Sequence, residues 1–198
     1  PLGKWVLEEA CRQMRAWRDA GHGDWRVAVN LSATQLASPS LPAEVAATLA
    51  AHAIAPGQLT LEITETMAMR DADACLRTLG QLTDLGVRIA IDDFGTGYSN
   101  LLYLRKLPAH ELKIDRSFVQ AMDSGPEDIA IVAAVVALAH TMRLQVVAEG
   151  VETAAQRNTL ERLGCDQLQG YLLGRPMEPD RFIALVVAQR DGERRRAS

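Results

Sequence analysis

The chain has 198 residues, of which 48% are hydrophobic and 23% are charged, and this composition is typical of one globular domain with a sizeable core. Its net charge of −4 provides no basic surface for a nucleic acid polymer, so we exclude that class of partner. No apolar run approaches the ~20 residues of a membrane span. Three scattered cysteines fit a reducing compartment. We therefore expect a cytoplasmic domain, and membrane anchoring of a longer parent protein is left open.

Strand patterns and helix patterns alternate along the whole chain. In the first helix, Leu7, Cys11, Met14 and Trp17 recur at helical spacing. The predicted helices cover residues 5–20, 41–54, 72–85 after an Asp71 cap, 101–105, 126–140, 154–163 after a Thr153 cap, and 178–190. The predicted strands cover residues 26–32, 58–64, 87–92, 110–115, 144–149 and 166–170. We assign residues 1–188 to the domain and expect residues 189–198 to form a polar, disordered tail.

This alternation indicates parallel βαβ units in an α/β fold. Because no dinucleotide-binding glycine pattern follows the first strand, two architectures stay open: a doubly wound sheet and a (β/α)8 barrel of the TIM type.

Each predicted strand has, at or near its carboxyl end, a side chain that can bind a metal ion or a substrate. In chain order they are Asn30, Glu62, Asp92 with Asp93, Lys113 with Asp115, Glu149, and Gln169. A lone acid at a strand end is more often a helix cap or a solvated loop residue. Here the side chains recur in phase, on the strand face opposite the branched apolar residues. This series favours a barrel, in which all of them would point into one mouth.

The residue types at this mouth predict a metal site. Several carboxylates that converge cannot all stay ionised without a cation. Carboxylate oxygens, together with an amide oxygen from Asn30, favour a hard ion such as Mg²⁺ or Mn²⁺, and the adjacent Asp92 and Asp93 favour a pair of ions acting on a phosphate ester. Lys113 lies inside a strand and in phase with Asp115, which favours a role in the site. A metal-dependent barrel that acts on carbonyl substrates with a lysine base is an alternative that these residues alone allow.

Six segments in order along the chain carry a resemblance to a known family. They are VNLSATQL, LEITE, IDDFGTGYSNLLYL, LKIDRSFV, VVAEGVET and QGYLLGRP. With these segments, the chain resembles the EAL-domain family of bacterial cyclic di-GMP phosphodiesterases from residue 1 to residue 182. The resemblance implies a (β/α)8 barrel with an antiparallel first strand. It also implies Mg²⁺- or Mn²⁺-dependent cleavage of cyclic di-GMP to linear pGpG.

The resemblance further implies a role for each site residue. Asn30, Glu62 and Asp92 would bind one metal ion, and Asp93 with Asp115 would serve a second. Lys113 would hold the attacking water or a phosphate oxygen, and Glu149 would position or deprotonate that water. Glu65 would anchor the loop after Asp93, Glu152 would brace the same region, and Gln169 would line the site.

One feature of the family does not occur in the chain. This feature is the E-x-L motif, whose glutamate is a metal ligand in the family, and the similar EEAC at residues 8–11 lies within a predicted helix. We therefore expect the chain to begin downstream of roughly the first two strands of the barrel. Two hypotheses remain: an enzyme that hydrolyses cyclic di-GMP, or an inactive module that binds cyclic di-GMP or a protein partner. The resemblance also implies a homodimer, which the apolar segment NLLYLRKL permits, and GGDEF or sensory domains in the parent protein.

Overall fold

The computed structural model describes residues 2–70, 72–97 and 101–197, so Asp71 and residues 98–100 of the glycine loop lie outside the described part. The helices are α1 (Leu2–Asp19), α2 (Ala33–Leu36), α3 (Leu41–His52), α4 (Glu65–Arg70), α5 (Ala72–Asp84), α6 (Leu101–Leu104), α7 (Arg116–Ala121), α8 (Pro126–Thr141), α9 (Ala154–Arg162) and α10 (Pro179–Ala197), with a 3-10 turn, η1 (Pro56–Gln58), before the second strand. The strands are β1 (Val27–Asn30), β2 (Leu59–Thr64), β3 (Arg88–Phe94), β4 (Glu111–Ile114), β5 (Gln145–Ala148) and β6 (Gln167–Leu168).

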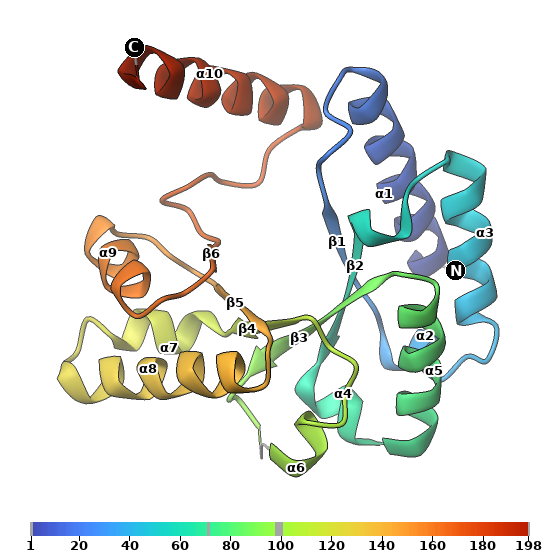
Figure 1. The fold of residues 1–198 in the computed structure, drawn as a ribbon, viewed down its shortest axis with the longest axis horizontal. Helices are drawn as coiled ribbons and strands as arrows, with labels where there is room; N and C mark the ends of the chain where they lie inside the picture. Colours follow the sequence, from blue (N-terminus) through green and yellow to red (C-terminus); the bar gives the residue numbers. More distant parts are fainter. Residues whose placement is uncertain (1, 71, 98–100, 198) are drawn as a thin grey trace.

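The strands form one parallel sheet in which neighbours in sequence are neighbours in space, in the order β1-β2-β3-β4-β5-β6. A doubly wound sheet reverses its strand order at a switch point, and this sheet does not, so the barrel-type architecture is confirmed. Figure 1 shows that the sheet curves as a half-barrel, with α1, α3, α5, α8 and α9 on its outer side. The segment after β6 runs toward the carboxyl end of α1, and helix α10 begins there and extends away from α1 (Figure 1).

The two faces of the strands differ as their alternating pattern predicts. The branched apolar face packs beneath the helices, where Leu61 of β2, Ile89 of β3 and Leu112 of β4 are each 0% exposed. The opposite face carries the polar side chains of the strand ends. On the edge strand β1 this inner face is open, and Ala28 is exposed there. The core therefore lies between sheet and helices, and the concave side of the sheet is left for the functional groups.

Three short helices, α2, α4 and α7, were not predicted from the sequence. Each covers only four to six residues, which is too short for a helical period to be visible. Local caps fix two of them: the Ser32 side chain accepts a hydrogen bond from the Gln35 amide, and the Asp115 side chain accepts one from the Ser117 amide. Strand β6 is shorter than predicted, with two residues in place of five.

Helix α10 extends to Ala197 and so includes residues 189–197, the segment that was predicted to form a polar, disordered tail. The segment is rich in arginine, which is a good helix former. The domain boundary at residue 188 stays a prediction. None of the helices in the described ranges combines the length and the apolar character that a membrane span needs.

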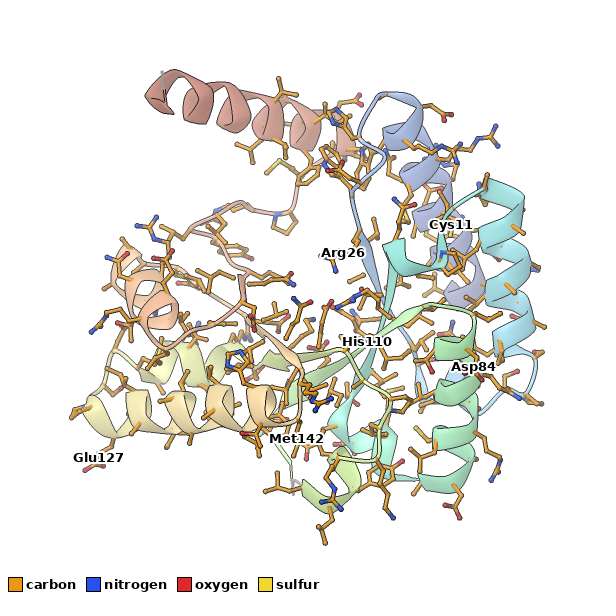
Figure 2. The ribbon with its side chains drawn as sticks, viewed as in Figure 1. Cys11, Arg26, Asp84, His110, Glu127 and Met142 are labelled. Atoms are coloured by element: carbon orange, nitrogen blue, oxygen red, sulfur yellow. The ribbon has the colours of Figure 1, made fainter. Side chains whose placement is uncertain are left out.

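The amino-terminal end of α10 is anchored by aromatic contacts. The Phe182 ring lies 5.7 Å from the Trp17 ring of α1 and 5.3 Å from the Trp25 ring just before β1, measured between centroids. Elsewhere the helices show the usual division of side chains: Cys11 on α1 is buried, whereas Glu127 at the start of α8 points into solvent (Figure 2). The aromatic contacts fix the end of α10 against the first βα unit.

Candidate active site

The candidate active site is built from the carboxyl ends of neighbouring strands. In the sheet, Asn30 of β1 pairs with Glu62 of β2, and Asp92 of β3 pairs with Thr64, two residues beyond Glu62. Lys113 of β4 pairs with Val147, so Glu149 lies two residues beyond that pair on the chain. Because alternate residues of a strand share a face, this register brings the polar side chains of successive strands to the same concave side.

A β-bulge brings the two adjacent aspartates together. The pairing of β3 with β4 runs from Ile91–Leu112 to Phe94–Ile114, so Asp92 and Asp93 together face Lys113 alone. The backbone of Asp93 is in the left-handed region, with φ of 54°. In a regular strand the two side chains would point to opposite faces. Bulges are common beside active sites because they redirect a side chain in this way.

Lys113 lies at the centre of the site and contacts three carboxylates. Its ammonium is 2.8 Å from Glu62 Oε1, 3.0 Å from Asp92 Oδ1 and 2.7 Å from Glu149 Oε1. The side chain of Lys113 is only 6% exposed, so these contacts form away from bulk water. These three ion pairs equal in number the three donors of an ammonium.

Burial and neighbouring charges shift the pKa values of the site. Burial by itself would lower the pKa of Lys113, but hydrogen bonds to Glu149 and Glu62 outweigh it and raise that pKa well above its ordinary value. Burial raises the pKa of Glu62, against the opposing effect of Lys113. Burial and the charges of Asp92 and Asp115 raise the pKa of Asp93. The carboxyl groups of Glu62 and Asp93 thus resist ionisation, mainly because they are removed from water.

Three carboxylates are close enough together to hold one metal ion. The ligand atoms of Asp92, Asp93 and Glu149 all lie within 4.8 Å of one another. Glu62 joins this group through Lys113, which contacts Glu62, Asp92 and Glu149 at once. The predicted carboxylate cluster is therefore present in three dimensions, with a lysine in its middle that can balance only part of its negative charge.

Glu65 lies where a loop anchor would be needed. It is the first residue of α4, it is 5% exposed, and its Oε2 accepts a hydrogen bond of 3.2 Å from the amide of Gly95. Gly95 is the second residue after Asp93 and has φ of 93°, a conformation that favours glycine. The loop turns again at Thr96, whose hydroxyl donates to the carbonyl of Asp93. The role of Glu65 as an anchor stays a prediction with this contact in its favour.

The remaining predicted residues surround the cluster without direct contact to it among the described residues. The side chain of Asn30 is exposed at the edge of the sheet. Asp115 accepts hydrogen bonds from the Ser117 amide and hydroxyl, which keep the pKa of Asp115 low despite the opposing effect of burial. Glu152 and Gln169 line a hollow of about 230 Å³ that borders Glu149.

Four residues that line this hollow were not assigned to the site from the sequence. They lie one or two positions after a predicted site residue in the chain, and they are Arg116, Gly150, Gly170 and Tyr171. The signal available was their place within the segments LKIDRSFV, VVAEGVET and QGYLLGRP. They share a hollow with Glu149 because the tertiary structure places the ends of neighbouring strands side by side.

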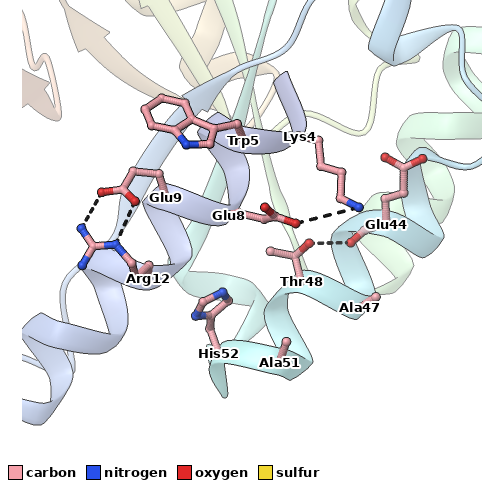
Figure 3. Close-up of a pocket in the computed structure, with 10 residues that line it drawn as sticks. All are labelled: Lys4, Trp5, Glu8, Glu9, Arg12, Glu44, Ala47, Thr48, Ala51 and His52. Atoms are coloured by element: carbon pink, nitrogen blue, oxygen red, sulfur yellow. Dashed lines mark hydrogen bonds and ion pairs between the residues drawn. The ribbon is translucent and has the colours of Figure 1, made fainter. Parts of the chain in front are cut away.

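A larger hollow, of about 480 Å³, lies between α1 and α3 (Figure 3). Among the residues that line it are Trp5, Arg12, Glu44 and His52. Lys4 and Glu8, which also line it, form an ion pair at 3.9 Å (Figure 3). None of the predicted site residues lies there. The chemistry of the strand ends, and not the size of a hollow, therefore locates the candidate active site.

Comparison with known proteins agrees with the architecture of the site. The EAL domain family matches residues 1–176. The chain is 58% identical over 185 residues to the bifunctional diguanylate cyclase/cyclic di-GMP phosphodiesterase MucR of Pseudomonas aeruginosa. The aligned region covers 93% of the chain and 27% of MucR. The chain is 46% identical over 176 residues to the cyclic di-GMP phosphodiesterase NbdA of the same organism, which covers 89% of the chain and 22% of NbdA. The chain thus spans about a quarter of the length of these curated relatives.

Solved structures give the same result. The phosphodiesterase PaMucR in complex with c-di-GMP superposes with a TM-score of 0.88 at 58% identity, covering 91% of this chain and 73% of that one. The EAL domain of Mycobacterium smegmatis DcpA superposes with a TM-score of 0.90 at 42% identity, covering 95% and 85%. The parallel half-barrel, its strand-end carboxylates and these matches lead to one conclusion: the chain belongs to the EAL domain family.

Proposed function

We propose that this chain is the catalytic part of a metal-dependent phosphodiesterase that hydrolyses cyclic di-GMP to linear pGpG. The observation that carries the proposal is the convergence of four carboxylates, Glu62, Asp92, Asp93 and Glu149, around the buried ammonium of Lys113. The names of the relatives MucR and NbdA, and the c-di-GMP complex of PaMucR, support the choice of substrate.

The donor set fits a hard divalent cation, and we assign Mg²⁺ or Mn²⁺. All of the clustered donors are carboxylate oxygens, with the amide of Asn30 at the adjacent strand end, and this is the set that such ions prefer. Burial, with a smaller effect of neighbouring carboxylates, raises the pKa values of Glu62 and Asp93, and a bound cation would favour their ionised forms. In the proposed two-ion site, Asn30, Glu62 and Asp92 would bind one ion and Asp93 with Asp115 would serve the second. The ligand atoms of Asp92, Asp93 and Glu149 lie within 4.8 Å of one another, which supports binding of a cation at this cluster. A bound divalent ion supplies positive charge for the phosphate oxygens and for the leaving oxygen.

The residues of the chain divide the remaining work. Glu149 lies beside both the cluster and the hollow, so it accepts the proton of the attacking water. Lys113 donates hydrogen bonds to the carboxylates and fixes their spacing, and its charge stabilises the negative charge that grows on the phosphate oxygens. Glu65 holds the loop after Asp93, while Glu152 and Gln169 line the hollow where the substrate lies.

We further propose a homodimer formed around α6, and a parent protein in the cytoplasm that carries GGDEF or sensory domains. Leu101 and Leu102 of α6 are 45% and 71% exposed, and burial of such side chains favours association. Cys11 and Cys165 form no disulfide, which fits a reducing compartment. The name of MucR, a bifunctional diguanylate cyclase and phosphodiesterase, supports a companion domain.

The test is conversion of cyclic di-GMP to pGpG by the parent protein, followed by anion-exchange chromatography in Mg²⁺, Mn²⁺ or EDTA. We expect turnover with either ion and none in EDTA. Glu149→Gln should reduce turnover by about 100- to 10,000-fold, the range for loss of a general base. Glu161→Gln on α9 is the matched control, because Glu161 is exposed and remote from the cluster.

Two results would overturn the proposal. Turnover that persists in EDTA would refute the dependence on metal. Binding of cyclic di-GMP without release of pGpG, in the presence of Mn²⁺, would instead establish the inactive binding module.

A further inference from the structure

We propose that α7 is a brace that sets the distance between the two halves of the carboxylate cluster, and that Phe118 is the positioning residue in it. This inference rests on the proposed function, because it concerns the same cluster. Asp92 and Asp93 come from β3 and Glu149 follows β5, so β4 and the helix after it lie between the two halves. Lys113 of β4 joins the two halves through its ammonium. Helix α7 follows β4 directly and touches the loops on both sides.

The first contact is between Phe118 and the loop after Asp93. A Cβ placed on Gly95 would lie 2.8 Å from Cε2 and Cζ of the Phe118 ring, so the ring edge lies against the backbone at this glycine. Gly95 also donates its amide to Glu65 on the other side of the loop. The loop is therefore held between Glu65 and Phe118, directly after the bulge that directs Asp93 into the cluster.

The second contact is between Arg116 and the residue after Glu149. Gly150 has φ of 70°, and a Cβ on it would overlap the Arg116 Cβ and lie 3.2 Å from the Arg116 Cα. The backbone of the first turn of α7 thus forms the surface against which the chain turns after Glu149. The amide of Glu149 donates to the carbonyl of Ile114, the last residue of β4, at 3.1 Å.

Helix α7 itself is fixed by an amino-terminal cap and by packing against the core. Asp115 caps its amino terminus by accepting from the Ser117 amide at 3.0 Å. Val119 is 0% exposed and is part of the hydrophobic core. A rigid element that contacts both loops will transmit its position to both sets of carboxylates. Residues that orient metal ligands in this way typically change metal affinity by 10- to 100-fold when replaced.

The experiment compares two replacements of similar volume and different reach. Phe118→Leu keeps the inner part of the side chain but lacks atoms at the position of Cε2 and Cζ, whereas the longer side chain in Phe118→Met reaches toward Gly95. Gln120→Ala, at an exposed position on the same helix, is the control for helix stability. The readouts on the metal-free protein are the melting temperature and hydrogen exchange of residues 93–97. The readout on the loaded protein is the dissociation constant for Mn²⁺ alone, measured by calorimetry.

We expect Phe118→Leu to weaken Mn²⁺ binding by about 10-fold and to accelerate exchange in residues 93–97. Phe118→Met should stay within about threefold of the wild type in affinity, a threshold well below the 10-fold lower bound of this effect. Equal Mn²⁺ affinity and equal hydrogen exchange in the wild type and both variants would overturn the proposal, because Phe118 would then only fill the core. Absence of Mn²⁺ binding by the wild type would also overturn it. Neither readout needs cyclic di-GMP, so a protein that shows the Phe118 effect without turnover refutes the proposed function alone.

Discussion

Replacement of Lys113 by methionine tests how the carboxylate cluster is held together. Methionine has a similar length and volume but no charge, so the main loss is the ammonium that contacts Glu62, Asp92 and Glu149 at 2.7 to 3.0 Å. The side chain of Lys113 is 6% exposed and those of its partners are 10%, 12% and 19% exposed, so water can replace little of the lost interaction. The Lys113→Met protein must therefore bury three carboxylates without a counter-charge.

The size of the effect follows from the geometry. At an effective dielectric constant of about 20, each contact contributes about 6 kcal/mol of Coulomb attraction, and desolvation of the buried charges offsets most of this gain. Removal of one partner from a buried ion cluster typically costs about 3–5 kcal/mol. We expect this loss in the free energy of unfolding of the metal-free protein near pH 7. A divalent ion that binds the same carboxylates at about 100 times its Kd would restore about 2.7 kcal/mol.

The assay is urea unfolding followed by circular dichroism, in EDTA and then in Mn²⁺. Lys106→Met removes an exposed lysine and should change stability by less than about 0.5 kcal/mol. A loss below about 1 kcal/mol for Lys113→Met in EDTA would refute the reasoning, because the carboxylates would then not depend on the lysine charge. Failure of Mn²⁺ to stabilise the Lys113→Met protein more than the wild type would show that the ion and the lysine do not serve the same carboxylates.

Two further predictions concern residues outside the cluster. Gly170→Ala should lower the melting temperature by about 4–10 °C, because a Cβ there would overlap the backbone N and O of Val151. Gly80 lies in a helix with open space around it, so Gly80→Ala should raise the melting temperature slightly. A thermal melt that ranks the two variants in the opposite order would contradict this prediction. His110 accepts a hydrogen bond from the Ile89 amide through Nδ1 at 3.1 Å, and burial, together with the charge of Arg88, lowers the pKa of His110, so the unfolded chain takes up the proton first. Its contribution to stability should be present above about pH 6.5 and be lost progressively as the pH falls below that value. His110→Asn, which keeps an acceptor without titrating, should flatten the curve of unfolding free energy against pH in this acidic range.

Much of the fold could be predicted from the sequence because its signals are local. The alternation of apolar and small or polar residues in 58–64 and 87–92 indicated strands, and it assigned Leu61 and Ile89 correctly to the packed face. The placement of acids near the strand ends predicted which residues would share a mouth. The short helices α2, α4 and α7 could not be predicted in the same way, because four to six residues do not show a helical period.

Strand order and the β-bulge depended on contacts between residues far apart in the chain. The alternating pattern allowed a doubly wound sheet as well as a barrel, and only the pairing of neighbours without reversal decided between them. Sequence alternation alone would have placed Asp92 and Asp93 on opposite faces. The bulge opposite Lys113 and the left-handed backbone of Asp93 bring both carboxylates into one cluster.

The sequence by itself determined the kinds of group at the site, since oxygen ligands and a strand lysine are read directly from residue types. The tertiary structure decided how these groups meet. Lys113 contacts three carboxylates that come from three other segments. Gly95 and Gly150 have no side chains, so α7 can lie against the two loops in which these glycines occur. The physical reason is that a carboxylate's pKa and its ability to bind a cation depend on its neighbours within a few ångströms, and those neighbours are set by packing.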